Sequence, residues 1–308
     1  MTATTFANSS RLLRFLCLIN CFSVVAGMAF ILSSQSALAL TQSDATTNAP
    51  DLWQPGVGTN AREQLQPEDK ADPWNLWTLG FAPEYYYWQE NANGAKLLDE
   101  SGIRYALTLS YKIAPVEGWL WAAQFKVYYG SVNYDGQTQG GTPLKSTTVY
   151  YGGLGIIQSG YRWDIGEHYN LDVVGGFGLE DWLRSLNGPG GYNENWRPIS
   201  FSADVELIPK ANGMIATLGV KVPFYTAQVV ELGRVGGGEV TLHPGTLPSP
   251  YAEAGYQFNK HLSLVAYFDS YLFAKSPTKT TVIGGYYAEV YQPQSETYQV
   301  GVKLGWTF

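Results

Sequence analysis

Apolar and polar residues alternate along residues 297–308. A period of two predicts a β-strand, because successive side chains of a strand point to opposite faces. One face is aromatic and aliphatic and the other is polar or glycine, which suits a barrel wall between lipid and a wet interior. The apolar face carries Tyr298, Val300, Val302, Leu304, Trp306 and Phe308, and the other carries Thr297, Gln299, Gly301, Lys303, Gly305 and Thr307.

The same alternation recurs from residue 77 onward and predicts ten strands. They are expected at residues 77–88, 102–113, 119–129, 147–163, 169–182, 199–208, 214–228, 251–258, 261–274 and 296–308. The connections alternate between short and long, the short ones at 114–118, 164–168, 209–213 and 259–260, and the long ones at 89–101, 130–146, 183–198, 229–250 and 275–295. Transmembrane barrels have short turns on one side of the membrane and long loops on the other.

The fold class that this pattern predicts is all-β, a transmembrane antiparallel up-and-down β-barrel of about ten strands. Eight or twelve strands are alternatives, because the ends of predicted strands are accurate only to a few residues. An even number puts both ends of the barrel on the short-turn side, so the five long loops are expected to be extracellular.

The residues before the barrel are predicted to form an export signal and a linker. In residues 1–39, Arg11 and Arg14 precede an apolar run, and small residues then suit cleavage after Ala39. An uncleaved anchor is the alternative, because the run is nearly long enough to span a bilayer. Residues 40–74 are polar, contain proline and lack alternation, so they are expected to form a flexible periplasmic segment, with partner docking as the alternative, before the barrel of residues 75–308.

Composition agrees with a membrane barrel and excludes several functions. Charged residues make up only 15% of the chain, with 22 Tyr, 10 Trp, 13 Phe and 34 Gly, and apolar residues at alternate positions keep the average hydropathy low. Cleavage removes Cys17 and Cys21, and with them disulfides and thiolate chemistry. It also leaves 17 Lys and Arg against 26 Asp and Glu, a formal net charge of −9, which argues against nucleic acid as a partner.

These features together resemble single-chain bacterial outer-membrane β-barrel proteins, over about residues 75–308. The resemblance rests on the export signal, the alternating strands, the aromatic residues near strand ends and the terminal Phe308. It implies a location in the bacterial outer membrane, with outer-membrane lipid and the barrel-assembly machinery as partners. It also implies that Trp306 and Phe308 form the signal that this machinery reads. The resemblance indicates an architecture and not an activity.

The alternation also predicts which charged side chains line the lumen. Seven acids and five bases fall on the inward face, with Arg162 as a further base, so the charges nearly cancel. The expected lumen-lining residues are Glu84, Arg104, Lys112, Lys126, Asp172, Glu180, Asp204, Glu206, Lys221, Glu253, Asp269 and Lys303.

Two interpretations of these charges remain open. They could form a structural network, since buried charges need partners, or a selective pore for small solutes or ions with Asp204 and Glu206 as a cation-attracting constriction. Ten strands enclose little space compared with the 16–18 of open porins, which favours the network. We therefore expect a narrow, charge-lined lumen.

Few residues of the chain suit catalytic chemistry. Omptin-like proteases, which are ten-stranded, place paired aspartates and an Asp-His dyad at the extracellular rim. Here His168 and His261 fall in predicted periplasmic turns, and His243, in a long loop, has only Glu239 nearby. Glu180 and Asp181 are the best rim carboxylate pair. No metal site, cofactor site or serine nucleophile motif is found, so we expect no catalytic residues.

The aromatic residues have two interpretations. Near strand ends they are expected to anchor the barrel at the lipid headgroups, as in Trp119, Trp121 and residues 85–88. For the loop residues Tyr134, Tyr192, Trp196 and Tyr291, carbohydrate stacking stays open.

The function expected is that of a non-enzymatic outer-membrane barrel, porin-like or structural. A surface adhesin or receptor that uses the long loops is the first alternative, and a rim-active hydrolase is the second.

Overall fold

The computed structural model describes residues 74–137, 141–188 and 191–308. The predicted export signal, and residues 40–73 of the predicted periplasmic segment, lie outside the described residues. Residues Asn75–Phe308 form a compact unit. No helix in the described part of the chain is long and apolar enough to span a membrane.

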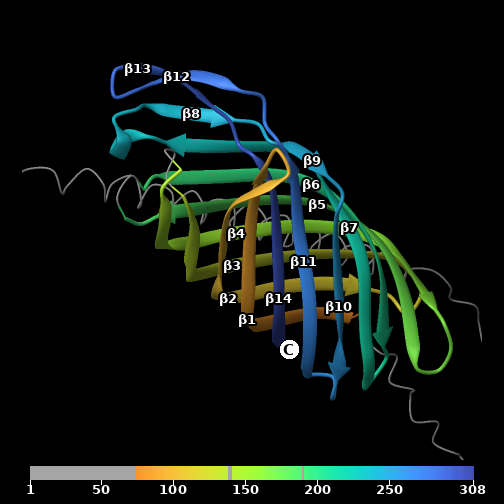
Figure 1. Ribbon diagram of the computed structural model, residues 1–308. Helices are drawn as coiled ribbons and strands as arrows, with labels where there is room; N and C mark the ends of the chain where they lie inside the picture. The colour runs from red at the N-terminus through yellow and green to blue at the C-terminus, as the bar shows by residue number, and fades with distance from the viewer. Residues whose placement is uncertain (1–73, 138–140, 189–190) are drawn as a thin grey trace, which may run out of the picture. The chain divides into compact units, whose positions relative to one another are not determined.

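Antiparallel β-strands form the wall of this unit (Figure 1). The first seven are β1 (Trp74–Ala92), β2 (Ala95–Ala114), β3 (Gly118–Gln137), β4 (Pro143–Asp164), β5 (Tyr169–Leu186), β6 (Asn193–Pro209) and β7 (Gly213–Glu231). The wall continues with β8 (Glu239–Leu242), β9 (Gly245–Leu247), β10 (Ser249–Gln257), β11 (Leu262–Ala274) and β14 (Gln294–Thr307). A 3-10 turn, η1 (Gly233–Val235), and a hairpin of β12 (Lys279–Ile283) and β13 (Tyr286–Val290) complete the elements.

The sheet closes on itself, which confirms the predicted antiparallel barrel. Neighbouring strands pair in chain order from β1 to β7, β14 pairs with both β1 and β11, and β10 pairs with both β7 and β11. Closure leaves no free sheet edge along these strands.

Strands β8, β9 and β10 act as one interrupted wall strand. β8 and β10 pair with β7 in the same register, as in Leu242 with Gln228 and Ser249 with Lys221. Pro244 and Pro248 lie in the gap, and proline has no N–H to donate to a ladder. Counted this way, the wall has the ten strands predicted.

The outer surface carries a belt of exposed apolar side chains. On β3 the belt runs from Trp119 to Tyr129, which are 70% and 60% exposed, a length close to the roughly 9–11 residues with which a tilted strand spans a bilayer. Further examples on the outer surface are Leu79, Phe81, Tyr105, Leu107, Val173, Leu179, Leu218, Val302, Leu304 and Trp306. A surface this apolar suits lipid better than water.

The strands continue beyond the belt, so the predicted long loops are largely wrong. Above Tyr129 the outward residues of β3 become polar, and Asp135 pairs with Lys145 of β4 at 3.0 Å. Most of the residues predicted as loops at 89–101, 130–146 and 183–198 are strand. In Figure 1, β8, β12 and β13 lie at the end of the barrel opposite the C-terminus.

Two of the predicted headgroup-anchoring aromatics also lie elsewhere. Tyr86 and Trp88 are 2% and 0% exposed and lie inside the barrel, because the alternation of β1 turns only the odd-numbered members of residues 85–88 outward. Tyr134 and Trp196, predicted in loops, are strand residues that are buried as well, so neither can serve as an exposed platform for carbohydrate.

Candidate functional site

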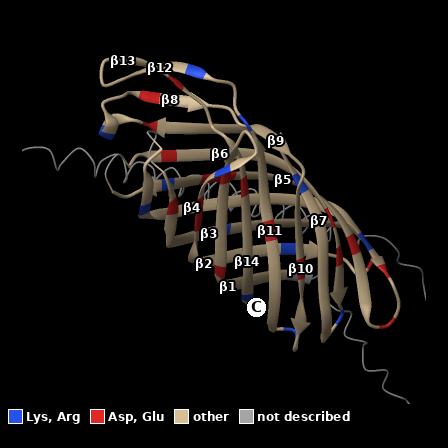
Figure 2. Cartoon of the chain, in the orientation of Figure 1, with Lys and Arg blue, Asp and Glu red and all other residues tan. Residues whose placement is uncertain are grey.

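The charged residues predicted to line the lumen are buried or half-buried on the wall strands. Glu84, Arg104, Asp172 and Asp204 are almost fully buried. Most of each wall strand is uncharged, with isolated charged positions (Figure 2). The remaining predicted residues are buried or half-buried: Lys112, Lys126, Glu180, Glu206, Lys221, Glu253, Asp269 and Lys303.

Glu84 of β1 organises the middle of the lumen. Its carboxylate accepts hydrogen bonds from Arg104 Nε at 3.0 Å, Lys126 Nζ at 2.8 Å and the Tyr267 hydroxyl at 2.6 Å. The Arg104 guanidinium also lies 3.9 Å from the centre of the Tyr86 ring, a cation–π contact. One acid thereby joins strands β1, β2, β3 and β11.

A second network lies towards the short-turn end. Arg162 donates two parallel hydrogen bonds to Asp172, each at 2.7 Å. Lys112 of β2 reaches the same aspartate at 2.8 Å and Glu206 of β6 at 2.6 Å. Bidentate and shared contacts of this kind fix the groups in place. Glu206 is therefore neutralised by a lysine, which argues against its role in a cation-attracting constriction.

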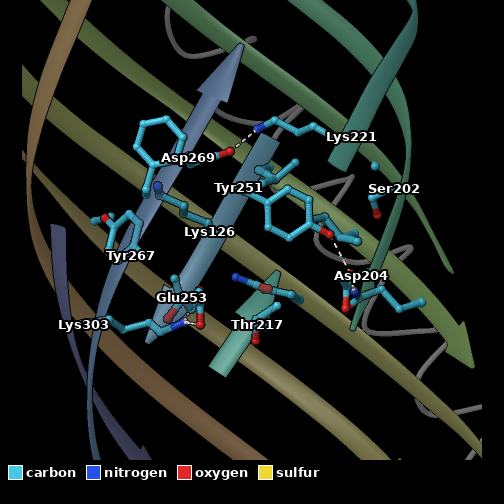
Figure 3. Close-up of a pocket in the computed structure, with 18 of the residues that line it drawn as sticks. Lys126, Ser202, Asp204, Thr217, Lys221, Tyr251, Glu253, Tyr267, Asp269 and Lys303 are labelled. Atoms are coloured by element: carbon cyan, nitrogen blue, oxygen red, sulfur yellow. Dashed lines mark hydrogen bonds and ion pairs between the residues drawn. The ribbon is translucent and has the colours of Figure 1, made fainter. Parts of the chain in front are cut away.

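A cavity of about 190 Å³ lies among further pairs (Figure 3). Lys221 contacts Asp269 at 2.7 Å, and Lys303 contacts Glu253 at 2.9 Å. The Tyr251 hydroxyl donates to Asp204 at 2.6 Å.

Glycine in the wall makes room for the tyrosine that binds Asp204. Tyr251 lies opposite Gly219 of β7, and a Cβ atom added there would come within 2.4 Å of the tyrosine ring. The absence of a side chain at this position lets the ring lie flat against the wall and reach its acid.

Above this cavity a layer of buried aromatic rings fills the barrel. Trp88 of β1 and Trp196 of β6 meet with ring centroids 5.1 Å apart, and Trp196 also stacks on Trp182 at 5.6 Å. Phe273 of β11 packs 5.1 Å from Trp196. Trp88, Trp196 and Phe273 are fully buried. Since four strands separate β1 from β6 in either direction around the wall, these contacts cross the lumen.

Beside the aromatic layer lies an acidic cluster that the sequence analysis missed. Arg184 of β5 is fully buried and donates to Glu100 at 2.7 Å and to Glu194 at 2.9 Å. Glu90 lies 3.6 Å from the same guanidinium and accepts a hydrogen bond from Trp88 Nε1 at 3.1 Å. One arginine thus faces three carboxylates. These residues fall in or beside segments predicted as loops, although the alternation of their strands extends to them.

Glu90 lies beyond the apolar belt, near the hairpin turn of β1 and β2. Burial raises the pKa of its carboxyl to about 7; Arg184 acts in the opposite direction, while Glu194 and Glu100 raise the pKa further. The ionised form of Glu90 is therefore disfavoured in the folded protein.

A larger cavity, of about 680 Å³, opens above the cluster. Its lining comes from the upper ends of the wall strands and from the hairpin β12–β13. Among the lining residues, Leu232, Val240 and Leu242 belong to a buried apolar group with Val230. The larger and smaller cavities have no lining residue in common, because the aromatic layer lies between them.

The residues considered for hydrolysis do not come together. Glu180 points inward and accepts hydrogen bonds from the Tyr128 and Tyr271 hydroxyls, whereas Asp181 lies outside and pairs with Arg197 at 3.0 Å. The predicted rim pair is therefore wrong. Nδ1 of His243 lies 3.1 Å from the carbonyl oxygen of Thr226.

The other two histidines lie at or beside short turns, as predicted. Within the described ranges, no group of three or more His, Cys, Asp or Glu residues could hold a metal ion.

The two residues predicted as an assembly signal lie on the last strand tract and its end. Trp306 is exposed and stacks on His261 with ring centroids 5.6 Å apart. Phe308 is also exposed, and its backbone N–H donates to the carbonyl of Trp77 at 2.9 Å. Their side chains are thus available on the outer surface.

No protein-family model matches the sequence, and the comparison with curated protein sequences gives no match. Several solved structures are similar in fold. The outer-membrane protease OmpT from Escherichia coli has 12% identity and a TM-score of 0.49, covering 77% of this chain and 98% of OmpT. An outer-membrane channel from Pseudomonas putida F1 has 12% identity and a TM-score of 0.38, covering 80% and 100%.

The transport unit of the autotransporter AIDA-I from Escherichia coli is a third similar structure, with 7% identity and a TM-score of 0.38 over 81% of this chain and 93% of that one. At these identities and scores, the three likenesses carry neither an activity nor a site over to this chain.

Proposed function

We propose that this chain is an exported outer-membrane barrel without catalytic activity, whose lumen is closed to solutes and ions. The apolar belt supports the membrane location, since the belt matches the length of a bilayer-spanning strand. The short turns and the C-terminus would then face the periplasm. The strand extensions above the belt would face the outside.

The contact of Trp88 with Trp196 is the observation that carries the closed lumen. Side chains from opposite walls meet there at 5.1 Å between ring centroids, and both residues are fully buried. Packed aromatic rings leave no path for water or ions. The cavities above and below this layer are separate.

The lumen charges then serve the structure and do not guide a solute. Glu84, Asp172 and Glu206 each bind a cation at hydrogen-bond distance. The pair of Lys112 on β2 with Glu206 on β6 joins walls that face each other across the lumen, and in each pair the opposite charge offsets the cost of desolvation.

Liposome swelling tests the absence of transport. Liposomes that contain the purified protein are expected to swell in arabinose no faster than liposomes without protein. Liposomes that contain a porin of known activity are the positive control and should swell faster. Swelling above the protein-free rate would overturn the proposal.

A surface receptor or adhesin is the second candidate, and the hairpin β12–β13 favours it. Tyr286 and Tyr287 at its turn are 80% and 87% exposed. Tyrosine is enriched at binding interfaces, because its ring is apolar and its hydroxyl polar. Comparing cell adhesion of the double variant Tyr286→Ser, Tyr287→Ser with that of the parent tests this role; equal adhesion would exclude the hairpin as the adhesive element.

A further inference from the structure

The cavity of about 680 Å³ at the upper end of the barrel has the size and lining of a ligand site. Its walls are mostly apolar, with residues from strands on both sides of the barrel and from the hairpin β12–β13. The apolar and aromatic lining includes Leu97, Leu98, Tyr134, Leu144, Leu186, Tyr192, Val230, Leu232, Val240, Leu242, Ile283 and Val290.

Every charged residue described in this lining is an acid. Glu90 and Glu194 lie at the floor, above the aromatic layer, and Glu289 lies on the hairpin. The lining contains neither lysine nor arginine among the described residues. Negative charge in a partly enclosed apolar space attracts cations, because the low dielectric strengthens the interaction.

Arg184 does not balance this charge. Its guanidinium donates to Glu100 and Glu194, which leaves Glu90 at 3.6 Å without a hydrogen bond from it. When Glu90 is ionised, three carboxylates face one guanidinium and leave an excess of two negative charges. Uncompensated buried charge is costly, so a further cation would be stabilised at this place.

Gln228, another polar residue of the lining, has an unpaired acceptor atom. Gln228 is 1% exposed, and its amide nitrogen donates to Gln292 at 2.6 Å. Its carbonyl oxygen Oε1 has no hydrogen-bond partner in the described part of the chain. An unpaired buried acceptor beside carboxylates suits a ligand that donates several N–H groups.

We propose that this cavity binds an amphipathic cation, an ammonium or guanidinium group carried on an apolar body. The cationic group is placed against Glu90, with the Gln228 carbonyl as a second acceptor. The apolar body lies against the leucine, valine and tyrosine side chains above. The proposal rests on the closed barrel of the proposed function, because the aromatic layer forms the floor of the site.

Three small molecules that share the same indole ring separate the contribution of charge to binding from that of apolar contact. Tryptamine carries an ammonium group, tryptophol replaces it with a hydroxyl, and indole-3-acetate carries a carboxylate. Equilibrium dialysis against the full protein purified in detergent is expected to show one tryptamine bound per chain. Tryptophol is expected to bind at least about tenfold more weakly, and indole-3-acetate more weakly still. Equal binding of all three, or none by tryptamine, would overturn the proposal.

Variants locate the site. Glu90→Gln is expected to weaken the binding of tryptamine about tenfold and to leave the binding of tryptophol unchanged. The matched control Glu253→Gln removes an acid from the smaller cavity below the aromatic layer and is expected to change neither. If Glu253→Gln weakens tryptamine binding as much as Glu90→Gln does, the binding site is not in the upper cavity.

A further variant, on the hairpin, tests the site without changing a fully buried residue. Ala288 lines the cavity from β13 and is only partly buried, so Ala288→Trp would fill the space without disturbing the wall. It is expected to weaken both tryptamine and tryptophol; unchanged binding of both would count against the cavity. Dialysis reports binding whether or not the barrel conducts, so the failure of this proposal is distinct from that of the closed lumen.

Discussion

Trp88 and Trp196 stand on strands that lie opposite each other in the barrel wall, and their rings pack edge to face with centroids 5.1 Å apart. Each indole nitrogen donates to a carboxylate two residues away on its own strand, Trp88 to Glu90 and Trp196 to Glu194. The rings therefore satisfy their only polar atoms while they fill the lumen. This arrangement couples the closure of the barrel to the acidic cluster beside it.

Removing one of these rings should weaken the barrel. Trp196→Ala deletes a fully buried indole that contacts Trp88, Trp182 and Phe273, and is expected to lower the free energy of unfolding by about 3–5 kcal/mol. Urea unfolding in detergent micelles measures this. Trp119→Ala, at a 70% exposed position on the outer face, is the matched control; an equal loss in both variants would contradict a packed lumen.

Breaking the central ion network should cost far more than breaking a surface pair. Glu84→Ala leaves Arg104 and Lys126 without their shared acid, and we expect a loss of about 3–5 kcal/mol in the free energy of unfolding. Lys145→Ala breaks the exposed pair with Asp135 and should cost less than about 1 kcal/mol. Comparable losses in the two unfolding curves would show that the lumen network does not stabilise the barrel.

The stability of the barrel should depend on the protonation of Glu90. Because the folded-state pKa is raised to about 7 from an ordinary value of 4.5, the proton stabilises the fold at low pH and this contribution is lost as the pH rises through 7. Glu90→Gln is therefore expected to raise the unfolding midpoint at pH 8 and to leave it nearly unchanged at pH 4. The titratable and charged groups around Glu90 are Arg184, Glu100, Glu194, Tyr134 and Tyr192.

Thermal melts of the parent and the variant at both pH values test this prediction. A variant that melts lower than the parent at pH 8 would mean that the Glu90 carboxylate is well paired in the folded protein. Glu296→Gln, on β14 and outside the cluster, is a suitable control.

Phe308 should matter for assembly more than for stability. Its side chain is exposed, so Phe308→Ala is expected to leave urea unfolding of the refolded barrel nearly unchanged. The amount of folded protein in the outer membrane of growing cells, measured by a gel shift on heating, is expected to fall several-fold. Normal amounts of folded Phe308→Ala protein in the membrane would refute a role in assembly.

The wall of the barrel was largely predictable from the sequence, because one physical constraint repeats along it. Each strand separates an apolar outside from a polar inside, so the positions of Arg104 and Asp172 follow from those of their outward neighbours. Even the pairing of β14 with β1 agrees with this rule, with Leu79 opposite Trp306.

The upper part of the barrel was mispredicted because polar residues on both faces hide the alternation there. Above the belt, outward positions no longer need to be apolar, so the sequence pattern of these strands resembles that of loops. One local signal was present: Asn93-Gly94 is a strong hairpin motif, and both residues adopt the positive φ that it requires. Recognition of this turn would have extended β1 to Glu90 and β2 to Glu100.

The crossing contacts could not be predicted, because alternation gives the face of a residue but not its depth in the lumen. Glu180, Trp182 and Arg184 all face inward by parity on β5, yet the depth of each depends on the shear of the whole barrel. The pairing of Arg184 with Glu100 and Glu194 follows only from the assembled wall.

Single-channel recording in planar lipid bilayers tests the closed lumen most directly. The purified protein is expected to give no conductance steps above the lipid background, whereas the double variant Trp88→Ala, Trp196→Ala, which removes both crossing rings, should conduct. Discrete steps from the unaltered protein would contradict the claim that the aromatic layer closes the barrel.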